Sequence, residues 1–117
     1  MTMKQKKAKI PDWLVGQFRI ALAGEIYPQI RAIAIRYVEN DDRKLLIRYY
    51  LDRNPMEFDY ESIEMVSTEL DSITPINYWN RIELECVFSK KLKKDLDPLD
   101  GFVYSRREYD MQDNPSP

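Results

Sequence analysis

A run of carboxylates without any basic residue nearby is the most distinctive chemical feature of the sequence. The stretch EFDYESIEMVSTELD, residues 57–71, contains six Asp or Glu side chains and neither Lys nor Arg. The wider window 54–80 is also free of Lys and Arg, although the chain has 18 basic residues. A surface of one charge sign attracts partners of the opposite sign. This window therefore predicts either an ordinary solvated helix face or a surface that binds a positively charged partner.

The residue types that usually carry catalysis or bind metals are scarce in this chain. There is no His, and Cys86 is the single Cys. These absences exclude a Ser-His-Asp triad, a His-bearing metal site and a Cys-cluster zinc site. The three glycines, Gly16, Gly24 and Gly101, are too far apart for a phosphate-binding loop. Carboxylates are plentiful, but no spacing marks a catalytic pair. We therefore expect a non-enzymatic protein without catalytic residues, cofactor or metal.

Length and charge predict one acidic domain with two tails. The 117 residues suffice for a single core, which we expect over residues 11–108, between a flexible basic tail, 1–10, and a flexible tail, 109–117. Four of the 18 basic residues are lysines of the first tail, so the rest of the chain carries a formal charge of about −6. Such a body suits a basic protein better than nucleic acid. The absence of a signal core, a membrane-spanning run and paired cysteines favours the reducing cytoplasm.

The periodicity of apolar residues predicts the element order α-β-β-α-β-β. Helical spacing follows Pro11 and returns after Pro55, whereas alternation predicts strands in the segments QIRAIAIRYV, KLLIRYYLD and RIELECVF. The segment GFVYSRR is predicted to form a short fourth strand. The first two strands are joined by an Asn- and Asp-rich turn, typical of an antiparallel hairpin. Apolar strand faces need a helical cover. We therefore expect a two-layer α+β fold, with a four-stranded, mainly antiparallel sheet and both helices on one face.

The second predicted helix has an apolar stripe and an acidic stripe, and the acidic stripe supplies the candidate binding residues. Ile63, Val66 and Leu70 recur at helical spacing on the apolar side. Two adjacent loop aromatics follow the helix, and Tyr and Trp are enriched at binding hot spots. The candidate residues for a basic partner are Glu57, Asp59, Glu61, Glu64, Asp71, Tyr78 and Trp79. The alternatives are a solvated helix face and aromatics that cap the end of the sheet.

The outer face of the predicted sheet offers a different function. Arg36, Arg48 and Tyr50 are expected to face solvent there, as are Glu83 and Glu85. An aromatic ring and two guanidinium groups on a sheet can stack RNA bases, so a small RNA-binding module is the alternative function. The acidic body argues against it, and the two glutamates are placed to pair with the arginines across the strands.

Several short elements resemble a family of bacterial proteins. The family pattern L-x-G-E-(I/V)-x-P-x-(I/L)-R-A corresponds to Leu22–Ala32, and an acidic (D/E)-x-E-S helix start corresponds to Asp59–Ser62. A later T-E pair is Thr68-Glu69, and the ending GFVYSRREY, Gly101–Tyr109, has one residue fewer before the aromatic than the family. The stretch from Trp13 to Glu108 thus resembles immunity proteins of contact-dependent growth inhibition systems.

The resemblance implies a protein partner and a way of neutralising it. Such proteins bind the C-terminal toxin domain of a cognate effector in the cytoplasm. The toxins are often nucleases, including enzymes that cut tRNA, and a nuclease cleft is usually basic because it holds phosphates. An acidic inhibitor that enters this cleft would block it, which agrees with the charge of residues 57–71.

Overall fold

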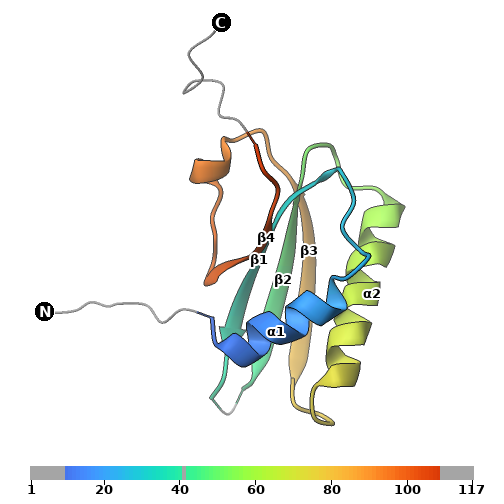
Figure 1. Cartoon of the computed structure of the whole chain (residues 1–117), viewed down its shortest axis with the longest axis vertical. Coiled ribbons are helices and arrows are strands. Elements are labelled where there is room, and N and C mark those ends of the chain that lie inside the picture. Colours follow the sequence, from blue (N-terminus) through green and yellow to red (C-terminus); the bar gives the residue numbers. More distant parts are fainter. Residues whose placement is uncertain (1–9, 41, 109–117) are drawn as a thin grey trace, which may run out of the picture.

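Two helices pack on one face of a four-stranded sheet in the computed structural model, which describes residues 10–40 and 42–108 (Figure 1). The elements are α1 (Asp12–Ala21), β1 (Ile30–Val38), β2 (Lys44–Leu51), α2 (Glu57–Ile73), β3 (Arg81–Phe88), the short 3-10 helix η2 (Lys93–Asp95) and β4 (Gly101–Ser105). The predicted α+β class and the order of the helices and strands are confirmed, with η2 as an addition. The predicted tails lie outside the described residues, apart from Ile10, which is buried in the core.

The sheet is mixed, with strand order β3-β2-β1-β4. β1 pairs antiparallel with β2 and with β4, as expected of a mainly antiparallel sheet. The antiparallel description is wrong for β2 and β3, which run parallel with Tyr49 opposite Cys86. Parallel neighbours need a long crossover, usually a helix, and the 17 residues of α2 provide it. α2 therefore connects two neighbouring strands and packs on the face of the sheet.

Helix α1 begins where the sequence predicts and buries a narrow stripe. Pro11 occupies the N-cap position with extended backbone angles, and Leu14, Phe18 and Ala21 then face the core. The turn after the helix uses Gly24 at φ +80°, in the left-handed region that other residues adopt only at a cost. This turn leads the chain past α2 before it enters β1 (Figure 1).

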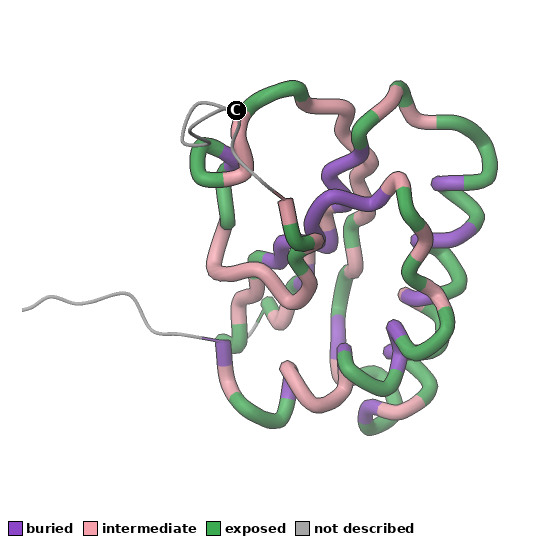
Figure 2. Tube along the Cα trace, turned by 45° about the horizontal axis from the view of Figure 1, so that its top comes forward, coloured by how far each residue is buried: buried purple, intermediate pink, exposed green. Residues whose placement is uncertain are grey.

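The core lies between the helices and the sheet. Side chains that alternate along the strands, such as Ile33 and Ile47, meet Ile63, Val66 and Leu70 of α2, and all five are inaccessible to solvent. Figure 2 shows the same division along the trace of α2, with buried positions on the side toward the sheet and exposed positions on the outer side. The apolar stripe predicted for the second helix is therefore confirmed.

The opposite face of the sheet is partly covered by the connection between β3 and β4. Leu96 packs there against Ala32, Ala34 and Tyr50, and the Tyr50 hydroxyl donates a hydrogen bond to the carbonyl of Asp97 (2.8 Å). Tyr50 is only 5% exposed, so the prediction that it faces solvent is wrong. The reason is that the 12 residues between β3 and β4 fold back over the sheet.

The predicted pairing of acidic and basic side chains across the outer face is confirmed for one pair. Arg48 lies beside Glu85 in the parallel register and donates a hydrogen bond from Nε to Oε1 (2.6 Å). Its Nη1 also donates to the Tyr50 hydroxyl (3.0 Å). Arg36 is exposed on the neighbouring strand.

Candidate functional site

The solvent face of α2 carries the carboxylates that the sequence singled out. The exposed acidic side chains of the helix are Glu57, Glu61, Glu64, Glu69 and Asp71. None of them forms an ion pair with any residue in ranges 10–40 and 42–108. The last turn has no basic residue, so the helix dipole opposes its acids by about 0.3–1 kcal/mol each. The charges of Glu69 and Asp71 therefore do not stabilise the isolated helix, whereas Glu57 lies in the first turn, where the dipole favours an acid.

Asp59 differs from the other candidate carboxylates because it is fully buried. It accepts hydrogen bonds from Nη1 and Nη2 of Arg53 (2.5 and 3.2 Å), from the Tyr27 hydroxyl (2.5 Å) and from the backbone N–H of Met56 (2.7 Å). Burial alone would raise the pKa of Asp59, but the bonds from Arg53, Tyr27 and Met56 outweigh it and lower the pKa. The structure thus places Asp59 inside the fold, away from the exposed acidic face.

The Asp59 carboxylate joins three segments that are distant in the sequence. Tyr27 belongs to the connection between α1 and β1, Arg53 follows β2, and Asp59 lies in the first turn of α2. Burial and the hydrogen bond to Asp59 raise the pKa of the Tyr27 hydroxyl, which therefore stays a donor at neutral pH. The bond fixes the α1–β1 connection beside α2, where the candidate surface lies.

Exposed apolar side chains lie among the carboxylates of α2, and sequence reasoning missed them. Phe58 and Met65 are 56% and 60% exposed, and Ile26 of the α1–β1 connection is exposed beside them. Together with Glu25 and Glu61 they line a hollow of about 200 Å³. The sequence did contain a signal for this patch, because residues 58 and 65 are two helical turns apart and do not belong to the buried stripe. The surface is therefore an apolar patch with an acidic rim.

The two predicted loop aromatics lie at the end of the sheet rather than on this patch. Trp79 is only 7% exposed and stacks on Trp13 of α1, with ring centroids 6.2 Å apart. Tyr78 makes T-shaped contacts with both Trp rings, and the guanidinium of Arg43 lies 5.2 Å from the centroid of the Tyr78 ring. These contacts support the alternative interpretation, in which the aromatics cap the sheet and hold α1 against it.

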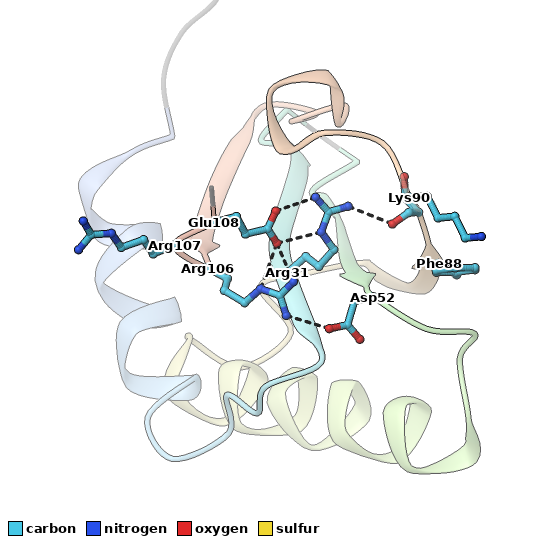
Figure 3. Close-up of a pocket in the computed structure, with 8 residues that line it drawn as sticks. Arg31, Asp52, Phe88, Lys90, Arg106, Arg107 and Glu108 are labelled. Carbon is cyan, nitrogen blue, oxygen red and sulfur yellow. Dashed lines mark hydrogen bonds and ion pairs between the residues drawn. The ribbon is translucent and has the colours of Figure 1, made fainter. Parts of the chain in front are cut away.

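A larger hollow, of about 670 Å³, brings together two of the family-like elements (Figure 3). Arg31 donates to both carboxylate oxygens of Glu108 (2.9 and 2.7 Å) and to the carbonyls of Ser89 and Lys91. Arg106 bridges the same Glu108 to Asp52. The hydrogen bonds from Arg31 lower the pKa of Glu108. Because these charged groups are paired with one another, we interpret the cluster as a tie between the end of β4 and the sheet.

No group of three or more His, Cys, Asp or Glu side chains within residues 10–40 and 42–108 is placed to hold a metal ion. Over those same ranges, none of the helices has the length and apolar character needed to cross a bilayer.

Comparison with known proteins identifies the family. No curated protein matches the sequence. The family model described as MafI2 immunity protein matches residues 11–108. This match confirms the resemblance to immunity proteins. The matching family is of the Maf type, so the assignment to contact-dependent growth inhibition systems stays a prediction. The chain belongs to the MafI2 immunity protein family.

Proposed function

We propose that this protein binds the toxic domain of its cognate toxin in the cytoplasm and neutralises it through the exposed face of α2. The observation that carries this proposal is the combination on one surface of unpaired carboxylates with exposed Phe58 and Met65. Membership of an immunity protein family supports a toxin as the partner. The protein acts by binding, and no catalytic step is required of it.

The composition of the surface suits a tight complex with a basic protein. Large apolar side chains at the centre of an interface supply most of its binding free energy, while polar groups form the rim. Phe58 and Met65 can serve as the apolar centre. The surrounding glutamates steer a cationic partner into contact, which raises the association rate.

The charge of the surface indicates the class of toxin and the way in which it is inhibited. A nuclease must hold phosphate groups, so its active cleft is lined by Lys and Arg. We propose that the toxin is a nuclease, with tRNA as the substrate class, and that α2 occupies its cleft. In keeping with the resemblance, the toxin domain is the C-terminal domain of an effector delivered by contact between cells.

No observation favours the alternative function as an RNA-binding module. The Tyr50 ring, which would have to stack on a base, is buried under the β3–β4 connection and packs against Phe102. Arg48 is already paired with Glu85. Tyr50 therefore does not offer the exposed ring on which sheet-based RNA recognition would stack a base.

Binding and inhibition can be tested together with the toxin domain encoded beside this protein. We expect a complex with nanomolar affinity that weakens as salt is raised, and we expect equimolar protein to stop cleavage of tRNA. Calorimetry measures the affinity, and gel analysis of tRNA measures the inhibition. A toxin domain from an unrelated system is the control. No binding at micromolar concentrations would refute the proposal, and binding without loss of cleavage would refute occlusion of the cleft.

A further inference from the structure

The hollow between α2 and the α1–β1 connection has the size and lining of a pocket for a single side chain. Its volume is about 200 Å³, and its lining residues are Gly24, Glu25, Ile26, Tyr27, Phe58, Glu61, Ser62 and Met65. Four of them come from each of the two segments, so the pocket exists only because the fold brings the segments together. Its walls are mainly apolar, and carboxylates belong to both sides.

Two aromatic rings, one from each segment, line this pocket and contact each other. Tyr27 and Phe58 meet edge to face, with centroids 5.0 Å apart and planes inclined at 68°. The Tyr27 hydroxyl is held by buried Asp59, so this ring has a fixed position before any partner arrives. The face of an aromatic ring attracts a cation within about 6 Å of its centroid. A lining with two aromatic rings is therefore suited to a flat cationic group.

The remaining lining residues offer hydrogen-bond acceptors. Glu25 and Glu61 lie on opposite sides of the pocket, one in each segment, and neither forms an ion pair with another described residue. Ser62 also lines the pocket, but it is only 6% exposed and its hydroxyl interacts with the buried Tyr49 hydroxyl. The two carboxylates are therefore the acceptors that the pocket offers to a ligand that donates hydrogen bonds.

We infer that this pocket receives one arginine side chain of the toxin, an inference that rests on the proposed function. A guanidinium is planar, stacks on aromatic faces and donates several hydrogen bonds in its plane, so it can meet the rings and both carboxylates together. It is also less strongly hydrated than a lysine ammonium, which favours it in a pocket with apolar walls. The aliphatic part of the side chain would pack against Ile26 and Met65.

The first test uses a small probe and does not depend on the toxin. N-acetyl-arginine amide is titrated into the protein while the methyl signals of Ile26 and Met65 are followed by NMR. We expect saturable shifts with a dissociation constant on the order of 10 mM. The matched probe with an uncharged citrulline side chain should give no saturable shift, and the lysine analogue should bind more weakly. Equal shifts with the citrulline and arginine probes, or no shift with either, would overturn the inference.

The second test uses the toxin domain and two substitutions that remove the same charge. Glu61→Gln changes a pocket residue, whereas Glu64→Gln changes an exposed residue of α2 outside the pocket. We expect Glu61→Gln and Phe58→Ala each to raise the dissociation constant by about 30-fold, mainly through faster dissociation. Glu64→Gln should raise it by no more than about threefold. Thermal melting of Phe58→Ala verifies that this variant is folded.

The outcomes separate the pocket from the proposed function. If the wild-type protein binds the toxin and Glu61→Gln weakens binding no more than Glu64→Gln, the arginine pocket is refuted while the proposed function stands. If the wild-type protein does not bind the toxin at all, the proposed function is refuted. The arginine probe then still decides whether the pocket recognises a guanidinium group.

Discussion

Reversing three exposed charges of α2 is expected to slow association with the toxin domain by about 100-fold at low ionic strength. The variant carries Glu61→Lys, Glu64→Lys and Asp71→Lys, all on exposed positions of the helix. The physical reason is that these carboxylates create the field that steers a basic toxin toward α2. Stopped-flow fluorescence at several salt concentrations measures the rate constant, and the difference between the two proteins should shrink as salt screens the charges.

A matched variant distinguishes a local field from net charge. Glu39→Lys, Glu83→Lys and Asp95→Lys change the total charge by the same amount at exposed positions outside α2. We expect this control to associate only a few-fold more slowly than the wild-type protein. If both triple variants associate equally slowly, the overall acidity guides the toxin and α2 has no special part in the encounter.

The second large effect concerns the stability of the fold rather than binding. Asp59→Ala is expected to lower the free energy of unfolding by about 3 kcal/mol, because it leaves the Tyr27 hydroxyl and Arg53 without their shared acceptor. Urea unfolding followed by circular dichroism measures the loss. Glu57→Ala, an exposed acid in the same first turn, should change stability by only about 0.5 kcal/mol. Equal losses in the two variants would contradict the structural part assigned to Asp59.

The stabilising effect of Asp59 should depend on pH in a defined direction. Its pKa is lower in the folded protein than the ordinary value of about 3.9, so the unfolded chain takes up the proton first as pH falls. The stability difference between the wild-type protein and Asp59→Asn should therefore be constant at neutral pH and shrink below about pH 4. Glu108 also has a lowered pKa, but it is present in both proteins and cancels in the comparison. A difference that stays constant down to pH 2 would contradict this assignment.

Local periodicity predicted the elements well, because it records which side of each element is buried. Ile63, Val66 and Leu70 had to share a face, and the structure places them in the core. The parallel pairing of β2 with β3 was missed, since alternation within a strand does not identify its neighbour. The long helix between the two strands contained the information, because a crossover of that length permits parallel pairing.

The candidate surface was predicted only in part, since burial depends on residues that are distant in the sequence. Asp59 has the same local spacing as its exposed neighbours, yet Tyr27, 32 residues away, and Arg53 enclose it. Phe58 and Met65 become part of a hollow only because the α1–β1 connection places Ile26 beside them. Burial of Tyr50 likewise depends on how the β3–β4 connection folds, which no strand pattern specifies.

The structure of the complex with the toxin domain is the most direct test of the proposed binding surface. We predict that Phe58 and Met65 become buried against the toxin, and that the glutamates around them lie within salt-bridge distance of Lys or Arg side chains lining its active cleft. A complex in which the outer face of α2 stays open to solvent while the toxin occupies another surface would contradict the account, as would a toxin cleft without basic residues.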